Sequence, residues 1–402
     1  MALMPVAEAL KRVLADAGPL PSETVALHDA RGRVLAEDLS ALRTQPPAAV
    51  SAMDGYAVRG ADVAQAPVAL KVIGEVAAGH PFAGAIKAGE AARIFTGGMM
   101  PDGSDTVVIQ EITTPEGDRV VMHKPTATGR NVRAEGIDFR QGQVLLHKGT
   151  RLSDRDLMLA AAMNHARLPV HRRPKVAVAG TGDELVPPGT APGPGQIVYS
   201  NGFALAALAA AEGAETRDFG IVPDRIEAIA AAVRQARDWG ADILVTTGGA
   251  SVGEHDLVQR ALKAEGMDLS FWRVALRPGR PMMHGRLGTL QVLGLPGNPV
   301  SSYVCAFLFL APLIRRLSGR SEVERAPEPA HLGAPLRAND ERADYLRATL
   351  AMGPDGPVAT PVPDQDSSLM APLAQAGCLV IREPYAPAAP AGSPCVIVKL
   401  GL

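Results

Sequence analysis

The sequence predicts a multidomain α/β protein built around a mixed, largely parallel α/β sheet domain. Its 402 residues are more than one ordinary hydrophobic core accommodates. Between about residues 174 and 317, continuous apolar runs alternate with helical patterns, as in a parallel sheet that is covered on both faces. Short β-type runs between glycine turns fill residues 51–150 and 331–402. These runs indicate a β-rich domain and a small C-terminal β-barrel.

Local patterns predict the individual elements. Apolar residues at helical spacing over residues 6–14 predict an amphipathic N-terminal helix. Residues 25–39 are interpreted as two short strands around a tight Arg-Gly turn, and Ser153 is the expected N-cap of a helix over residues 154–164. The strands of the sheet are expected in the apolar runs KVAVAG, ADILVTTGG and TLQVLGLPGNP.

The composition is that of an ordinary globular protein, with 47% apolar and 20% charged residues. The formal net charge of -2 gives no electrostatic reason to expect nucleic acid or an anionic membrane as a partner. Cys305, Cys378 and Cys395 form no C-x-x-C pair and are flanked by apolar residues, so buried free thiols are expected.

The sequence shows neither the pattern of a membrane span nor that of a signal peptide. The longest apolar run, residues 300–314, is shorter than the roughly 20 residues that cross a bilayer, and Pro312 interrupts it. This run predicts a buried helix. The first residues lack a basic stretch followed by an apolar one. We therefore expect a cytoplasmic protein.

Three glycine-rich turns follow predicted strands of the sheet, at residues 180–184, 246–256 and 294–301. Ligands of such sheets bind beyond the carboxyl ends of the strands, where glycines let backbone N–H groups approach an anion. Each turn alone is equally consistent with a connection that needs glycine only for its geometry, whereas three on one edge favour a site. Neither a G-x-G-x-x-G nor a Walker lysine motif occurs, so neither a dinucleotide site nor a P-loop is supported.

Charged side chains in and near these turns suggest a metal and an oxyanion. The carboxylates are Asp183, Glu184, Glu254 and Asp256. Carboxylates beside a phosphate require a cation such as Mg²⁺ to separate the like charges. Arg277 and Arg280 share a rigid turn, and guanidinium groups suit oxyanions. The alternatives are solvated turn residues or helix caps for the carboxylates, and solvated cations for the arginines.

Seven motifs occur in order over about residues 51–301: SAMDGYAV, IFTGGMMPDGSDTVV, GTRL, TGDEL, TTGGASVGEHD, RPGRP and GLPGNPVS. Together they make the chain resemble the molybdopterin molybdenumtransferase family, which also includes the C-terminal domain of gephyrin. The resemblance implies an enzyme that inserts molybdate, as a substrate, into adenylylated molybdopterin, with Mg²⁺-dependent release of AMP. It also implies an elongated homodimer, a site shared between subunits, and contacts with molybdopterin adenylyltransferase and molybdoenzyme maturation proteins.

The resemblance and the changes in residue pattern along the chain together predict four domains. The ranges are 5–22 with 173–320 for the α/β domain, 23–45 with 142–172 for an elongated linking domain, 46–141 for a β-rich insert domain, and 328–402 for the C-terminal β-barrel.

The resemblance also implies roles for individual residues. The expected catalytic residues are Asp54, Thr96, Asp138, Glu184 and Asp256, and the expected metal ligands are Glu184, Asp224 and Asp256. The expected substrate-binding residues are Gly248, Gly249, Ser251, Arg277, Arg280, Pro296, Asn298, Pro299, Ser301, Arg347 and Ser367.

Two positions depart from the family's pattern. Arg280 stands where a lysine is usual, and the acidic Gly-Glu-Asp element reads Gly136-Ile137-Asp138, so one carboxylate is absent. Either change could tune the choice between molybdate and tungstate. Two other functions are less favoured. One is a gephyrin-like scaffold, but no long linker or second catalytic domain is appended here. The other is a molybdopterin adenylyltransferase, whose sheet domain is similar but which lacks the insert and the barrel.

Overall fold

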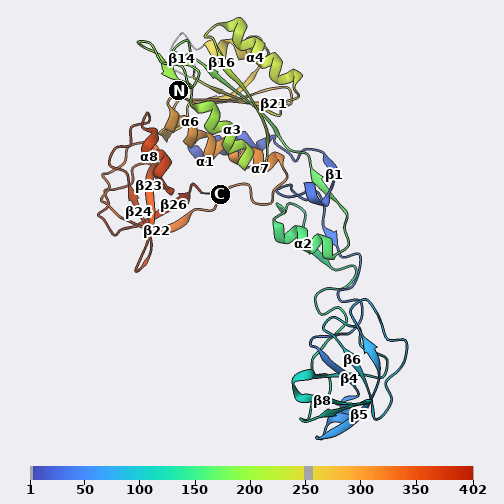
Figure 1. The fold of residues 1–402 in the computed structure, drawn as a ribbon. Coiled ribbons are helices and arrows are strands. Elements are labelled where there is room, and N and C mark those ends of the chain that lie inside the picture. Colours follow the sequence, from blue (N-terminus) through green and yellow to red (C-terminus); the bar gives the residue numbers. More distant parts are fainter. Residues whose placement is uncertain (1–2, 249–256, 402) are drawn as a thin grey trace.

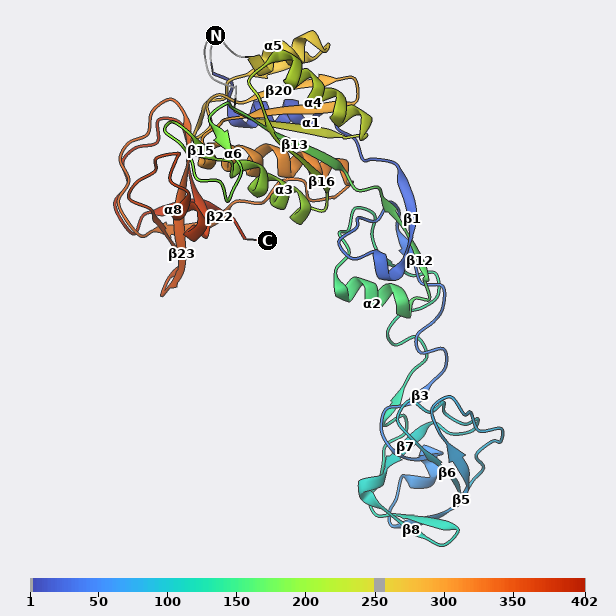
Figure 2. The same ribbon diagram turned by 45° about the horizontal axis from the view of Figure 1, so that its top comes forward.

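The structure is a computed structural model that describes residues 3–248 and 257–401. The molecule is elongated (Figure 1 and Figure 2). The sheet domain and the C-terminal barrel lie together at one end, the linking domain follows, and the β-rich insert lies at the opposite end.

The sheet domain contains a six-stranded mixed sheet in the order β16-β13-β17-β21-β20-β18. Its strands are β16 (Glu215–Val222), β13 (Lys175–Thr181), β17 (Ile243–Thr247), β21 (Leu290–Leu295), β20 (Met283–Leu287) and β18 (Asp268–Trp272). The first four are parallel, whereas β20 pairs antiparallel with both β21 and β18. The predicted mixed, largely parallel sheet is confirmed. A small parallel pair, β14 (Leu185–Val186) and β15 (Ile197–Val198), lies beside it in the chain.

Two layers of helices cover this sheet. Successive strand residues point to opposite faces, so each layer packs against its own set of strand side chains. Val176 and Val178 pack in the cluster that includes α1 (Val6–Ala15) and α3 (Asn201–Ala211). Ala177 and Ala179 pack with α4 (Ile226–Asp238) and α5 (Leu257–Ala264) on the other face.

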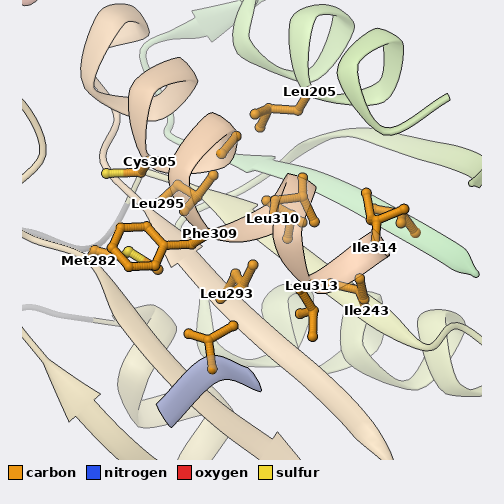
Figure 3. Close-up of a cluster of buried hydrophobic side chains, with 14 of the residues drawn as sticks. Leu205, Ile243, Met282, Leu293, Leu295, Cys305, Phe309, Leu310, Leu313 and Ile314 are labelled. Carbon is orange, nitrogen blue, oxygen red and sulfur yellow. The ribbon is translucent and has the colours of Figure 1, made fainter. Parts of the chain in front are cut away.

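One long apolar helix, residues 299–317, fills the core between α1, α3 and the sheet. It consists of α6 (Pro299–Cys305), a π-helical turn (Ala306–Leu310) and α7 (Ala311–Leu317), and Pro312 does not break it. Among the described helices it alone has the length and the mean hydropathy, 1.5, to cross a membrane, but 83% of that stretch is buried. Figure 3 shows Phe309 and Leu313 packed against the strand residue Leu293. The predicted buried helix is confirmed.

The linking domain has a small core of its own around Leu35, Phe139 and Leu168. Its elements are β1 (Ser22–Ala26) paired with β12 (Arg167–His171), β2 (Leu39–Ser40) paired with β11 (Val144–Leu146), and α2 (Asp154–Ala162). Ser153 caps α2 as predicted, and its hydroxyl and backbone both exchange hydrogen bonds with Asp156.

The insert is a six-stranded sheet in the order β7-β4-β6-β5-β9-β8. Its strands are β4 (Gly55–Val58), β5 (Val68–Val76), β6 (Glu90–Ile94), β7 (Thr106–Ile109), β8 (Thr113–Glu116) and β9 (Arg119–Met122). The short strands β3 (Val50–Ser51) and β10 (Val132–Arg133) pair where the chain enters and leaves it.

The C-terminal region is a closed five-stranded β-barrel, which confirms that prediction. Its strands are β22 (Glu328–Leu332), β23 (Ala343–Gly353), β24 (Gly356–Pro361), β25 (Cys378–Arg382) and β26 (Pro394–Lys399), and a short helix α8 (Met370–Gln375) lies between β24 and β25. The barrel closes because β23 pairs with both β24 and β25. Cys305 and Cys378 are buried free thiols as predicted, whereas Cys395 is only partly buried.

Candidate functional site

The three predicted turns meet at one edge of the sheet. The neighbouring parallel strands β13, β17 and β21 end in register, since Gly180 pairs with Thr247 and Thr247 with Leu295. Their turns therefore emerge side by side, as expected for a ligand site of an open sheet. The second turn is described only as far as Gly248. Three predicted site residues, Gly249, Ser251 and Asp256, lie outside the described residues.

A cavity of about 560 Å³ opens at this edge, between the sheet domain and the barrel. It brings together eight of the predicted residues: Glu184, Gly248, Arg277, Arg280, Pro296, Asn298, Ser301 and Ser367. Arg342 and Gln365 of the barrel also line it, and the sequence-based assignment missed both. Their positions in the sequence could have indicated them, because Arg342 stands five residues before Arg347 and Gln365 stands two residues before Ser367.

Hydrogen bonds join the two domains at this cavity. The Asn298 Nδ2 donates to Ser367 Oγ over 2.8 Å, and the backbone N–H of Val300 donates to the Ser367 carbonyl over 3.1 Å. Pro299 is the first residue of the long core helix, where its missing N–H costs little. The positive N-terminal end of that helix and Ser301 therefore face the same space as Ser367.

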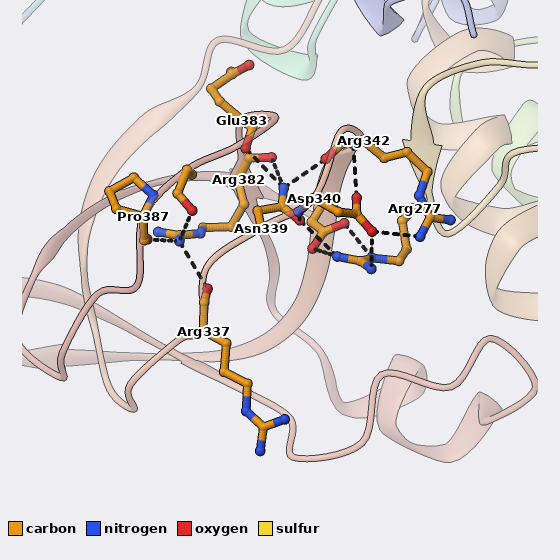
Figure 4. A network of polar contacts seen from close by, with 10 residues as sticks. Arg277, Arg337, Asn339, Asp340, Arg342, Arg382, Glu383 and Pro387 are labelled. Atoms are coloured by element: carbon orange, nitrogen blue, oxygen red, sulfur yellow. Dashed lines mark hydrogen bonds and ion pairs between the residues drawn. The ribbon is translucent and has the colours of Figure 1, made fainter. Parts of the chain in front are cut away.

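The two arginines of the 277–280 turn have different partners. Every nitrogen of the Arg277 guanidinium group is used: Nε donates to Asp344 over 2.6 Å, Nη1 to Asp340 over 3.0 Å, and Nη2 to Asn339 over 2.8 Å (Figure 4). The hydrogen bond to Asp344 is the main cause of a raised pKa for Arg277, and burial only partly opposes it. Two carboxylates thus offset its charge.

Arg277 lines the cavity but also has a structural role. Its donors hold β19 (Leu276–Arg277) against the start of β23 and so fix the barrel on the sheet domain. Arg280 is exposed, and no hydrogen bond or ion pair ties its guanidinium group to another described residue. Arg342 has a buried Nε with no partner among the described residues. Arg342 Nη2 also donates to Asp340 over 3.0 Å, so its charge is offset by a carboxylate. Of the arginines that line this cavity, Arg280 is the one with no carboxylate partner among the described residues, and it is therefore available to an anion.

Arg347 also has a structural role. Its side chain is buried, with 1% of the residue exposed. Its Nη1 donates to the Leu369 carbonyl over 2.7 Å, its Nη2 to the carbonyls of Asp364 and Asp366 over 3.2 and 2.9 Å, and its Nε to Gln365 over 3.3 Å. Arg347 therefore holds the loop that carries Ser367.

Three carboxylates gather at the ends of β13 and β16. Asp183 Oδ1 accepts the backbone N–H of Asp224 over 3.1 Å, which joins the two turns. Burial raises the pKa of Asp224, and repulsion from Asp183 and Glu184 raises it further. Gly182 is required for this geometry: its φ is +151°, and a Cβ there would lie 2.5 Å from a Glu184 carboxylate oxygen.

These carboxylates fit a cation that also binds the substrate. Within residues 3–248 and 257–401, no three His, Cys, Asp or Glu side chains are close enough to hold a metal by themselves. A magnesium ion bound with substrate phosphates needs only one or two carboxylates. The repulsion that raises the pKa of Asp224 is the electrostatic environment that such a cation relieves.

The predicted residues of the insert lie far from this cavity (Figure 1). Asp54 Oδ1 accepts hydrogen bonds from the backbone N–H and the hydroxyl of Thr96, over 2.7 and 2.8 Å. The backbone bond is the main cause of the lowered pKa of Asp54. Asp138 lines a separate cavity of about 570 Å³ with Arg43 and Arg133. Asp54 and Thr96 are thus hydrogen-bonded to each other, but at the opposite end of the molecule from Glu184.

The fold and this cavity define a multidomain α/β protein with a polar, cation-bearing site where a parallel sheet meets a barrel. Three family models match successive parts of the chain: the MoeA N-terminal region (domain I and II) over residues 4–164, the probable molybdopterin binding domain over residues 177–316, and the MoeA C-terminal region (domain IV) over residues 329–400. The chain belongs to the molybdopterin molybdenumtransferase (MoeA) family of enzymes, with a role in molybdenum cofactor biosynthesis.

Similar proteins cover nearly the whole chain. The molybdopterin molybdenumtransferase of Nostoc sp. is 39% identical over 340 residues, which are 83% of this chain and 77% of that protein. The enzyme of the same name from Haemophilus influenzae is 34% identical over 91% of both chains. The crystal structure of the molybdopterin biosynthesis MoeA protein of Pyrococcus horikoshii superposes with a TM-score of 0.85 over 100% of both chains, at 30% identity.

Proposed function

We propose that this enzyme inserts molybdate into adenylylated molybdopterin and releases AMP in a Mg²⁺-dependent reaction. The cavity at the sheet edge carries this proposal. There, Arg280 presents an unpaired cation to an oxyanion, Asn298, Ser301 and Ser367 present neutral donors, and Glu184 supplies the adjacent carboxylate. Fixed donors aimed at phosphoryl oxygens stabilise the charge that develops when a phosphoanhydride breaks.

The metal would be held by Glu184 and Asp224, together with Asp256, which lies outside the described residues. Bound Mg²⁺ offsets charge on phosphoryl oxygens. The residues of the chain do the remaining work: Asn298, Ser301 and Ser367 donate hydrogen bonds to the phosphoryl oxygens of the substrate, and Arg280 holds the molybdate dianion beside the dithiolene. Mg²⁺ removal by a chelator is expected to abolish AMP release.

The distance between the cavity and the insert supports a homodimer. Asp54, Thr96 and Asp138 cannot reach the Glu184 cavity of their own chain in this elongated arrangement (Figure 1). We therefore infer that the insert of one subunit completes the site of the other. The protein works in the cytoplasm, where the enzyme that adenylylates molybdopterin and the factors that mature molybdoenzymes would contact it.

Mixed dimers test both the reaction and the shared site. Asp54→Ala and Glu184→Ala homodimers are each expected to release almost no AMP from adenylylated molybdopterin and molybdate. A heterodimer of the two, isolated with two affinity tags, retains one intact site and should recover about half of the wild-type rate. The control is the Asp54→Ala/Thr96→Ala heterodimer, in which both sites are damaged and no recovery is expected. An inactive Asp54→Ala/Glu184→Ala heterodimer would refute the shared site.

The role of Arg347 is tested by a double-mutant cycle with Ser367. Arg347→Met is expected to raise the KM for molybdate about tenfold, because the Ser367 loop loses three of its carbonyl contacts. If Arg347 acts only through this loop, the KM for molybdate of the Arg347→Met/Ser367→Ala double variant should be only slightly higher than that of Ser367→Ala alone. Additive losses would instead assign Arg347 a direct contact with the anion.

A further inference from the structure

A further polar pocket, here called the arginine cavity, lies at the opposite end of α3 from the sheet edge. It has a volume of about 720 Å³ and lies where the linking domain, the ends of α3 and α7, and the barrel meet. Four arginines line it: Arg151, Arg315, Arg320 and Arg325. Both ribbon views place the C-terminal end of the chain beside α3 at this junction (Figure 1 and Figure 2).

One buried carboxylate organises these arginines. The side chain of Glu212, directly after α3, is 3% exposed and accepts Arg315 Nε over 2.9 Å and Arg320 Nη1 over 2.9 Å. Arg325 Nη2 lies 3.4 Å from the same carboxylate. Arg151 approaches from the linking domain and donates to the Ala211 carbonyl over 2.8 Å.

The charges at this cavity do not balance. The largely buried Arg315, Arg320 and Arg325 contribute three positive charges, whereas Glu212 and the C-terminal end of α3 supply about one and a half negative charges. Arg151 is exposed and is left out of this count, as are the exposed carboxylates. Of the other carboxylates, Glu328 is paired with Lys399 over 2.7 Å. Glu322 and Glu324 are exposed, where water and salt screen them.

Two buried hydrogen-bond donors of these arginines also lack a partner among the described residues. The side chains of Arg315 and Arg320 are 7% and 10% exposed, yet Arg320 Nε and Arg325 Nε are buried without a hydrogen-bond partner among the described residues. Burial lowers the pKa of Arg320 to about 10, and the neighbouring Arg151 and Arg315 contribute to this shift. A buried cation of this kind is stabilised by an additional anion.

We propose that the arginine cavity binds a tetrahedral oxyanion, either free or as the phosphate group of a small molecule. Arg320 and Arg325 supply the positive charge that Glu212 does not offset, and Arg151 closes the site from the linking domain. Because the contacts come from three domains, a bound anion would also stiffen the joint between the barrel, the sheet domain and the linking domain. The site is independent of the reaction proposed at the sheet edge.

Calorimetric titration of the full-length protein with inorganic phosphate tests this site. Arg151→Ala, at an exposed residue whose loss spares the core, is expected to weaken phosphate binding about tenfold, and Arg320→Met at least as much. Because Arg280 is expected to bind an oxyanion at the sheet-edge cavity, the titrations are carried out in the Arg280→Ala background, in which phosphate binding at the arginine cavity should persist. Arg237→Ala, at an exposed helix position, is expected to leave this binding unchanged.

The outcomes separate the proposals. Phosphate binding that Arg280→Ala removes, or that Arg151→Ala and Arg320→Met leave at the wild-type affinity, would overturn this site, as would no binding at millimolar phosphate. A parallel titration with a hexose phosphate identifies the source: tighter binding than inorganic phosphate indicates a phosphorylated metabolite, and weaker binding indicates the free anion. None of these results depends on whether the enzyme releases AMP.

Discussion

Glu212→Ala is expected to lower the free energy of unfolding of the sheet domain by about 3 to 5 kcal/mol. The substitution removes the one carboxylate that Arg315, Arg320 and Arg325 share, while all three cations stay close together at the end of α3. Uncompensated buried charge is more costly than the loss of any single surface ion pair, which is worth at most about 1 kcal/mol.

Urea unfolding followed by tryptophan fluorescence measures this loss. The chain has two tryptophans, Trp239 and Trp272, and both belong to the sheet domain, so the signal reports on the domain that contains Glu212. The matched control is Glu215→Ala, an exposed carboxylate three residues away, for which a change within about 0.5 kcal/mol is expected. Equal midpoints for the two variants would contradict the role of the buried carboxylate.

The pH dependence has a defined sign. Burial alone would raise the pKa of Glu212, but the hydrogen bonds and charges of the three arginines outweigh burial, so that its pKa in the folded protein lies below its ordinary value of 4.5. The stability it contributes is therefore complete above pH 4.5 and is lost as the pH falls through the folded value. The difference between wild type and Glu212→Ala should accordingly shrink only below pH 4.5.

Much of the fold could be predicted from local patterns, and the failures come from contacts between distant residues. Strands β17 and β21 are buried on both faces, so their sequences are continuously apolar. Residues 25–39, by contrast, were expected to pair with one another. Instead β1 pairs with β12, more than a hundred residues later, and residues 27–29 form a 3-10 helical turn. Nothing in the local alternation of these residues encodes so distant a partner.

In the candidate site, too, local features were predictable and contacts between distant residues were not. The turns after β13, β17 and β21 could be predicted, because glycine and polar residues directly follow apolar strands. The hydrogen-bond partners of Arg277 and Arg347 could not be predicted from the sequence. An arginine beside glycine and proline has the same local sequence whether its charge is unpaired among the described residues, as at Arg280, or is used by Asp344. Only the pairing of β19 with the barrel decides between them.

Gly248→Ala is expected to reduce the rate of AMP release about a hundredfold or more while the protein stays folded. Gly248 has a φ of +89°, a conformation that residues with a side chain rarely adopt. A Cβ at this position would overlap the main-chain oxygen of Thr181 at the end of β13. Relief of that overlap must separate the turns after β13 and β17, and these turns carry Glu184 and the residues that continue toward Asp256.

Gly240→Ala is the control that isolates this effect. Gly240 has a similar φ of +73° at the end of α4, but nothing lies within 4 Å of the position its Cβ would take. Both variants carry the same backbone strain, of about 1 kcal/mol, and Gly248→Ala loses additional stability through its overlap with Thr181. Only Gly248→Ala also displaces the sheet edge, so only it should lose activity. A Gly248→Ala enzyme as active as Gly240→Ala would mean that the close contact of these two turns does not shape the site.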